Sequence, residues 1–391
     1  MATVYLGVDW ANNGSYTDES SNTRSLIVRR GRQAIYSQSG PEQMSAGEIS
    51  STMNNAGRRF DPYNTGGALY GNIKQGRRVK LTVTDGSVTY PLFAGYADDI
   101  RPSGYGASSI AIIRAKDGLY WLGRQNCTAA ATQTNYAVYD ALMDLAAQSA
   151  WPLNASATVY PFTWPLTLGY LSIDNNGDTI DTFSPNADNT ILGEMQEIAA
   201  AFAGNLYVTA SGSLGYQSRD ASRPVRYTYT DDDITADTEV RMPWDEIYND
   251  LRVTPNGTSV ARTLANGTSK TEFGPSTMAI SNNAYIQSTT QADNMLTYLG
   301  AYLPEVKRPL RVRVRTGRTQ AAFGVDLCDK VRVTSSVLGI DTYYTVGGIE
   351  HNIANMNGGI TTTLTLEPDF GTVAGYQLYP FTWPLTLRGD W

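Results

Sequence analysis

Histidine is almost absent from this sequence of 391 residues, in which His351 is the only one. A lone histidine cannot form the Ser-His-Asp or Cys-His arrangements of most hydrolases, and it cannot build a zinc site of several histidines. No glutamate stands in a recognisable motif for a carboxylate pair that cleaves glycosides. The sequence therefore predicts a protein that is not an enzyme and that has no metal site and no cofactor.

Cysteine and charge are also scarce. Cys127 and Cys328 lie about 200 residues apart and fit no metal-ligand spacing, so buried thiols in a reducing compartment are the simplest interpretation. Charged residues make up 17% of the chain, below the roughly 25% of ordinary soluble proteins. The net charge is −7 and the basic residues are scattered, which argues against a nucleic-acid-binding protein.

Long apolar runs are missing as well. No run approaches the ~18 residues of a transmembrane helix, and residues 1–10 lack the basic start and apolar core of a signal peptide. We expect no membrane segment, and we expect the chain to be made in a cytoplasm.

Strand signals dominate the first third of the chain. Residues 79–84 alternate between apolar and polar side chains, Asp85-Gly86 is a strong hairpin turn, and residues 88–100 continue as a second strand. After a loop rich in glycine, residues 109–114 have the apolar pattern of a third strand. The sequence predicts a three-stranded β-meander.

The middle third has helical periodicity. Residues 136–150 predict an amphipathic helix with Asn135 as a possible cap, and residues 190–203 predict a second one with Gly204 at its C′ position. A strand pair around Ser211-Gly212 follows, and these elements predict a small α+β insert. A further helix is predicted at 290–303 and leads back into strands.

The last third repeats the pattern of the first. Residues 79–82 correspond to 331–334 and residues 93–100 to 346–353, with both offsets about 250 residues. Ile110 and Ile112 of the third strand correspond to Leu364 and Leu366. Any two meanders would align about as well at such low identity, but the shared order and spacing favour a duplication.

Two groups of charged residues are candidates for contacts between subunits. Alternation along residues 310–315 places Arg311, Arg313 and Arg315 on one face of a strand. This face is either solvated or binds carboxylates of a neighbouring subunit. Asp98 and Asp99 are acidic candidates, together with the run at 231–233, unless they are ordinary turn and surface charges.

A nine-residue repeat is a third candidate. The sequence Tyr-Pro-Phe-Thr-Trp-Pro-Leu-Thr-Leu occurs at residues 160–168 and again at 379–387. Its prolines exclude a helix interior and a central strand, so both copies are expected to be extended. Either they dock into equivalent grooves of a subunit or partner, or each packs on its own domain. The contact residues would be Tyr160, Phe162, Trp164, Tyr379, Phe381 and Trp383.

A series of short motifs stands in a characteristic order along the chain. The sequence Arg-Phe-Asp-Pro-Tyr-Asn at residues 59–64 ends a polar segment. A strand of the pattern Gly-basic-x-Val begins at residues 76–79, and Leu-Phe-Ala-Gly at 92–95 belongs to the strand that closes the hairpin. Together with residues 202–208 and 345–351, this series resembles the baseplate hub family of phage tail tips, relatives of which form the base of type VI secretion spikes.

The resemblance implies a structural virion protein at the tail tip, made in the host cytoplasm. Its fold would be mainly β with an α+β insert, with two related β-barrel hub domains in one chain that assembles as a ring. Three copies would present six similar units, so a homotrimer would adapt a six-fold tail tube to a three-fold fibre or spike. The expected partners are further copies of the chain, a tail-tube or distal-tail protein and a central fibre or spike protein. DNA would pass through the channel without specific binding.

The expected domains follow the repeats. They are a first hub barrel at 1–125, an α+β insert at 126–240, a second hub barrel at 241–370 and an extended C-terminal segment at 371–391. The alternative function is a tail adhesin, whose aromatic surface residues would bind glycans of the host surface.

Overall fold

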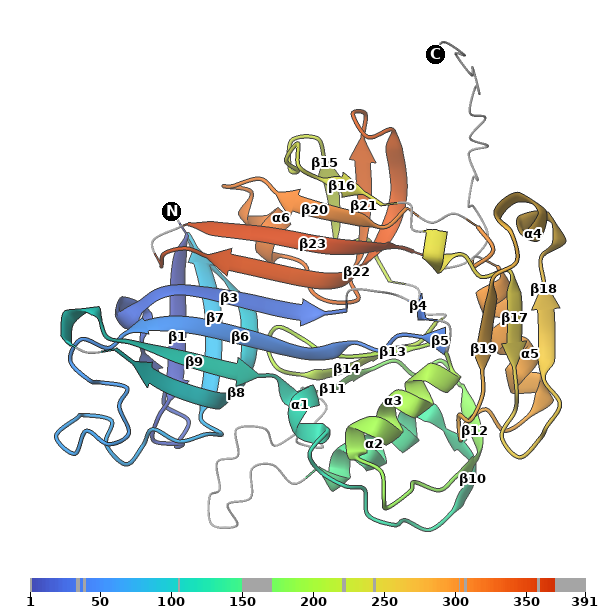
Figure 1. The fold of residues 1–391 in the computed structure, drawn as a ribbon, viewed down its shortest axis with the longest axis horizontal. Coiled ribbons are helices and arrows are strands. Elements are labelled where there is room, and N and C mark those ends of the chain that lie inside the picture. The colour runs from blue at the N-terminus through green and yellow to red at the C-terminus, as the bar shows by residue number, and fades with distance from the viewer. Residues whose placement is uncertain are drawn as a thin grey trace.

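The structure is a computed structural model that describes residues 2–32, 36–37, 40–104, 106–149, 171–219, 223–241, 244–301, 303–305, 308–356 and 359–369. Within these ranges the chain is mainly β-structure, as the sequence predicts (Figure 1). Both copies of the nine-residue repeat and the C-terminal segment 371–391 lie outside the described residues. No described helix is both long and apolar enough to cross a membrane.

The first predicted meander is confirmed. Strands β7 (Arg78–Asp85), β8 (Val88–Ser103) and β9 (Ile110–Lys116) pair antiparallel in sequence order. The turn between β7 and β8 is tight, and Gly86 adopts the positive φ of 59° that such a turn requires. The pairing of β8 with β9 shifts between Ala97 and Asp99, so Asp98 is the extra residue of a β-bulge.

The second predicted meander is confirmed too, but one detail of the repeat is wrong. Strands β21 (Lys330–Ser335), β22 (Ile340–Ile353) and β23 (Ile360–Pro368) repeat the antiparallel order of the first meander. Leu364 and Leu366 are buried, whereas Ile110 and Ile112 lie on the opposite face of their strand, where the buried positions are odd-numbered. The alignment of the third strands is therefore shifted by one residue, which exchanges the two faces.

The two meanders belong to one continuous sheet. Strand β3 (Thr23–Gly31) pairs antiparallel with the second half of β22, from Gly348 opposite Gly31 to Ile353 opposite Leu26. We call this pairing the seam. Strands β6 (Ser45–Asn54), β20 (Leu310–Val314), β16 (Glu239–Val240), β1 (Thr3–Asp9) and β2 (Thr17–Asp18) complete the strand order β16-β20-β23-β22-β3-β6-β9-β8-β7-β1-β2. Strand β15 (Tyr227–Thr230) pairs parallel with β21.

This sheet does not close. In the described ranges the two ends of the strand order, β16 and β2, pair with no further strand. The described part of a single chain therefore forms no closed barrel, although two barrels were expected. The reason is that β22 extends beyond its pairing with β21, and this extension forms main-chain hydrogen bonds with β3. The two halves are therefore hydrogen-bonded to each other, whereas in two separate barrels each half would close on itself.

A second hydrophobic core lies in the middle of the chain. It is built from residues between 119 and 303, whereas the core of the large sheet draws on both ends of the chain. We call the part around the second core the middle lobe. Its larger elements are helices α2 (Val138–Gln148), α3 (Ile191–Ala201) and α5 (Thr289–Gly300), and strands β10 (Gln133–Ala137), β12 (Thr179–Phe183), β11 (Leu171–Ile173), β13 (Asn205–Val208), β14 (Leu214–Gln217), β17 (Asp250–Val253), β18 (Arg262–Ala265) and β19 (Thr277–Ile280). The expected domain boundaries remain predictions.

The three helices of the middle lobe were predicted, but the residues predicted to cap two of them are wrong. Asn135 does not cap α2, because it lies within β10 with a φ of 51°, and Ala137 precedes the helix without a side-chain cap. The left-handed residue after α3 is Ala203, with a φ of 50°, one position before Gly204. Thr190 does cap α3, since its side chain accepts a hydrogen bond from the Gly193 amide at 3.0 Å.

The short elements are helices α1 (Gly118–Leu122), α4 (Gly267–Phe273) and α6 (Thr319–Phe323), the 3-10 helices η1 (Ser20–Asn22), η2 (Gly106–Ser108) and η3 (Trp244–Glu246), and strands β4 (Tyr36–Ser37) and β5 (Gly40–Pro41). The middle lobe lies toward one end of the large sheet, and the turns β8–β9 and β22–β23 lie at the other (Figure 1).

Candidate functional site: a charged sheet face and a buried junction

One face of the large sheet carries charged side chains across seven neighbouring strands. Alternation sets this face apart from the core: in β3, Val28 is buried while Arg29 points outward, and in β6, Ile49 is buried while Glu48 points outward. In β20 the apolar residues are buried and both arginines are exposed. We call the outward side of β8, β9, β6, β3, β22, β23 and β20 the polar face.

Two grooves lie on the polar face. The first has a volume of about 560 Å³ and runs over the seam, where Arg29, Arg311, Glu350 and Glu367 are among its lining residues. Across the seam Arg29 donates to Glu350 at 3.0 Å. This groove includes one of the three predicted arginines.

The second groove has a volume of about 610 Å³ and is lined by Asp98, Asp99, Arg101, Arg114 and Lys116 among others. Arg29 and Glu48 line both grooves, so the two are adjacent. The predicted acidic and basic residues therefore lie on one face but at opposite ends of it. Strands β8 and β20 are six strand spacings apart in the strand order, roughly 25–30 Å.

The three predicted arginines have different surroundings. Arg313 forms an ion pair with Asp237 at 2.7 Å, and Arg315 donates to the main-chain oxygens of Asp231 and Ile234 at 3.1 and 3.0 Å. Arg311 makes no side-chain hydrogen bond or ion pair with any residue that the structure describes. Only Arg311 thus keeps all its donors available for another molecule.

The acidic candidates differ in the same way. Asp99 forms an ion pair with Arg101, while Asp98 has no ion-pair partner among the described residues. The carboxylates of the run at 231–233 have partners within the chain. Asp231 accepts hydrogen bonds from Ser336, and Arg318 lies 3.7 Å from Asp233. Hydrogen bonds from Ser335 and Ser336 lower the pKa of Asp231.

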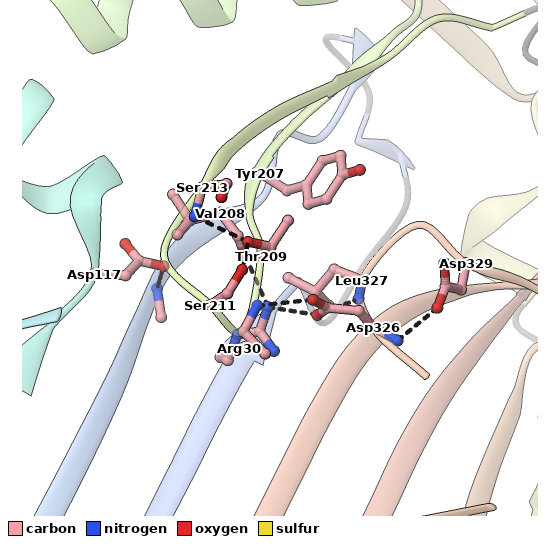
Figure 2. Close-up of polar contacts among 12 residues, drawn as sticks. Arg30, Asp117, Tyr207, Val208, Thr209, Ser211, Ser213, Asp326, Leu327 and Asp329 are labelled. Atoms are coloured by element: carbon pink, nitrogen blue, oxygen red, sulfur yellow. Dashed lines mark hydrogen bonds and ion pairs between the residues drawn. The ribbon is translucent and has the colours of Figure 1, made fainter. Parts of the chain in front are cut away.

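A buried polar junction lies beneath the polar face (Figure 2). The guanidinium of Arg30, on β3, is 2% exposed and donates to Asp326 at 2.6 Å and to the Val208 oxygen at 2.8 Å. The same carboxylate accepts from the Ala210 amide at 2.7 Å. Asp326 precedes β21, and Val208 and Ala210 belong to the β13–β14 hairpin. A single charge pair therefore joins the two halves of the sheet and the middle lobe.

Two further contacts strengthen this junction. Arg32 binds Glu367 of β23 through two hydrogen bonds of 2.9 and 2.7 Å, with both side chains buried. Asp117 accepts from the amides of Gly47 at 2.7 Å and Leu119 at 3.0 Å, and so holds β6 against helix α1. Burial raises the pKa of Asp117 to about 7.

The residues of the junction were not predicted from the sequence. A signal was present in the run Arg29-Arg30-Gly31-Arg32 directly after Leu26-Ile27-Val28, because alternation in a strand sends Arg29 and Arg30 to opposite faces. One arginine of such a pair must be buried and needs an acceptor. The acceptor lies almost 300 residues later in the chain, where no local pattern marks it.

The site contains little that could perform chemistry. His351 is buried with its ring 2.9 Å from the Thr362 hydroxyl, and burial lowers its pKa to about 3. Among the residues with a described position, no three of the His, Cys, Asp and Glu side chains form a group that could hold a metal ion. Cys127 and Cys328 are free and buried, which confirms that part of the prediction, while the reducing compartment stays a prediction.

Comparison with known proteins gives a clear result only at the level of structure. No protein-family model matches the sequence, and no curated protein matches it. The tail protein from Neisseria meningitidis MC58 is similar with a TM-score of 0.63 at 15% identity, over 94% of this chain and 97% of that one. The 43 kDa tail protein of prophage MuSo2 from Shewanella oneidensis is similar with a TM-score of 0.61 at 13% identity, over 94% and 98%.

The chain has the fold of phage tail proteins. The prophage tail protein gp18 from Listeria monocytogenes EGD-e is also similar, with a TM-score of 0.50 at 11% identity over 93% of this chain and 94% of that one. The tail-protein fold spans the large sheet and the middle lobe together, because the alignments cover nearly the whole chain. At such identities the similarity shows a shared fold, and a shared fold does not by itself imply a shared function.

Proposed function

We propose that the protein is a structural component of the phage tail tip, a hub in which three chains form a ring around a channel. The observation that carries the proposal is the open sheet of a tail-protein fold, whose two halves are joined at the seam and whose edges are unpaired within the described part of one chain. Each chain supplies two meanders, so three chains supply six similar units.

The unpaired edges are the basis for the ring. Strand β8 pairs with β9 from Asp99 to Ser103 on one side, and no described strand pairs with that stretch on the other side. At the far end, β16 pairs only with β20 among the strands that the structure describes. Exposed strand edges readily pair with another chain. A contact between two different edges closes into a ring when its rotation permits.

The positions of unpaired charges favour contact between the same two edges of neighbouring chains. Asp98 and Asp99 lie at the β8 edge, and Arg311 lies on β20, one strand in from the β16 edge and opposite Glu239 in the ladder. Neither Asp98 nor Arg311 has an ion-pair partner in its own chain as far as it is described. In the proposed ring the β8 edge of one chain meets the β16–β20 edge of the next. Opposite charges across a contact fix its register and orientation.

The polar face would then line the channel. Its charges are of both signs, and several are neutralised locally, as in the pairs Arg29–Glu350, Asp99–Arg101 and Arg313–Asp237. Such a surface produces little net field, so DNA would pass without binding tightly. In this proposal the sheets close between chains, and the ring adapts a six-fold tail tube or distal-tail protein to a three-fold central fibre or spike.

The test is the mass of the purified protein in solution. Light scattering should give a homotrimer of the 42.6 kDa chain, and the trimer should cosediment with assembled tail-tube protein of the same phage. A monomer that does not bind the tube protein but binds host glycans would instead support the adhesin alternative.

A further inference from the structure

The loop between β6 and β7, residues 55–77, has a fixed shape without regular secondary structure. A series of main-chain turn hydrogen bonds runs along it, from Arg58 to Asn55 at 2.8 Å, Asn64 to Asp61 at 3.1 Å, and Tyr70 to Gly67 at 3.0 Å. We call residues 55–77 the tyrosine loop. An ordered loop of this length is uncommon in a compact protein, and such loops usually carry a function.

Buried anchors hold the tyrosine loop on the sheet. Phe60 is fully buried, with its ring centroid 6.1 Å from that of Trp10. Its neighbour Arg59 donates two hydrogen bonds of 3.0 and 2.7 Å to Glu19, which is buried and also accepts from the Trp10 indole at 2.8 Å. Leu69 is buried further along the loop. The anchors restrict the backbone on both sides of the loop tip.

Two tyrosines project from this rigid support into solvent. Tyr63 is 84% exposed and Tyr70 is 52% exposed, the two most exposed tyrosines with a described side chain. A tyrosine on a fixed backbone has few rotatable bonds to immobilise and offers a large contact area with a polar end. Aromatic side chains of this kind are typical of the residues that contribute most to protein interfaces.

The charge of the tyrosine loop indicates the kind of partner. The chain has a net charge of −7, yet the loop contains Arg58, Arg59, Lys74 and Arg77 against a single acidic residue, Asp61. Arg58 and Arg59 are paired with Asp61 and Glu19, whereas Lys74 has no partner among the residues described. An acidic protein surface is therefore the complementary partner.

The position of the tyrosine loop leaves it accessible. It leaves the sheet at the end of β6, the same end as the turns β8–β9 and β22–β23, and away from the middle lobe (Figure 1). In a ring of three chains this end would present three copies of the loop toward the next ring of the tail. The middle lobe covers the opposite end.

We propose that the tyrosine loop is the docking surface for an acidic face of the tail-tube protein, with Tyr63 and Tyr70 as its main contact residues. This inference rests on the proposed hub function. In this inference the tail-tube protein contacts the end of the large sheet that carries the tyrosine loop. The fibre or spike would contact the other end, where the middle lobe lies.

The experiment compares Tyr63→Ser/Tyr70→Ser with wild type in binding to assembled tail-tube protein purified from the same phage. Val337→Ser/Tyr343→Ser is the matched control, because these side chains are 82% and 40% exposed on the β21–β22 hairpin. The loop variant should bind at least about tenfold more weakly, while the control binds like wild type and all three proteins remain trimers. High salt should weaken wild-type binding.

The outcomes separate the two proposals. Equal binding of the loop variant and wild type by trimers overturns the docking inference and leaves the hub function intact. A loop variant that loses glycan binding on an array, with tube binding unchanged, also overturns it. A wild-type protein that is monomeric and does not bind tube protein contradicts the hub function itself.

Discussion

At the scale of single residues, the ion pair of buried Arg30 with the partly exposed Asp326 links three parts of the chain. The guanidinium is 2% exposed, and the pair draws its hydrogen bonds from three separate segments of the chain. An arginine in such a place needs its counter-charge, because an uncompensated buried charge is costly. The pair therefore stabilises one arrangement of the sheet halves and the middle lobe.

Substitution Asp326→Asn should lower the free energy of unfolding by about 3 kcal/mol, because it removes the charge that compensates Arg30. The matched control is Asp341→Asn, which breaks the pair of Arg332 and Asp341, with side chains 41% and 51% exposed. That change should cost clearly less than Asp326→Asn, because solvent screens an exposed pair. Urea unfolding of both variants measures the difference, and equal costs would show that burial does not set the strength of the pair.

His351 gives a prediction about pH. Burial lowers its pKa to about 3, whereas the unfolded side chain titrates near its ordinary pKa of 6.5. Between these values only the unfolded chain binds the proton, so this side chain makes the free energy of unfolding fall as the pH drops. Relative to His351→Gln, wild type should lose about 2 kcal/mol between pH 7 and pH 5.

Urea unfolding of wild type and His351→Gln at several pH values measures this loss. Burial also raises the pKa of Asp117 to about 7, which acts in the opposite direction. Its contribution is common to both proteins and cancels in the difference between them. A difference that does not change with pH would contradict a neutral, buried His351.

Single residues were harder to predict from the sequence than the strands that hold them. The exposed pattern of Arg311, Arg313 and Arg315 is confirmed, because strict alternation in a strand determines which face each side chain takes. The contacts of Arg315 with main-chain oxygens were not foreseen, since they depend on where residues 231–234 lie in space. Asn135 was assigned to a helix cap on propensity alone, and tertiary pairing with β12 placed it in a strand.

At the scale of elements, the seam between β3 and β22 is the main feature that the sequence did not reveal. Both meanders follow from local alternation and from turn residues such as Asp85-Gly86. The pairing of Gly31 with Gly348 joins residues more than 300 positions apart. Local patterns predict that strands exist, but the partner of an edge strand depends on which backbone groups remain unpaired after the hairpins have formed.

Gly31 allows the seam to close. Its φ is +96°, and a Cβ atom there would lie 2.1 Å from the Gly347 oxygen and 2.7 Å from the Gly348 Cα. Substitution Gly31→Ala should therefore cost at least about 2 kcal/mol and increase amide hydrogen exchange along β3 and the second half of β22. Gly57→Ala is the control, because nothing lies within 4 Å of a Cβ at that position. If both variants were equally stable, close approach at the seam would not be required.

At the scale of the whole molecule, the open sheet explains why two meanders in one chain do not form two separate barrels. The edge at β8 and the edge at β16 belong to different halves of the strand order, and within the described residues neither edge pairs with the other. Three chains arranged head to tail can satisfy both edges. In the proposed ring, the hydrogen bonds of both edges would be satisfied between chains.

A charge exchange tests this contact between chains. Asp98→Arg should weaken the trimer, since it places a positive charge opposite Arg311 of the next chain, and Arg311→Asp should weaken it from the other side. The two changes combined should restore trimers. Asp188→Arg, an exposed position in the middle lobe, serves as the control for altered net charge. Light scattering measures the mass of each variant, and failure of the double variant to recover would rule out this pairing of edges.

Electron microscopy of the purified protein tests the proposed ring. End-on views should show a closed ring of three chains, with six similar units around a central hole and the middle lobes at one end of the particle. Isolated single chains, or assemblies without a central hole, would contradict the proposed ring.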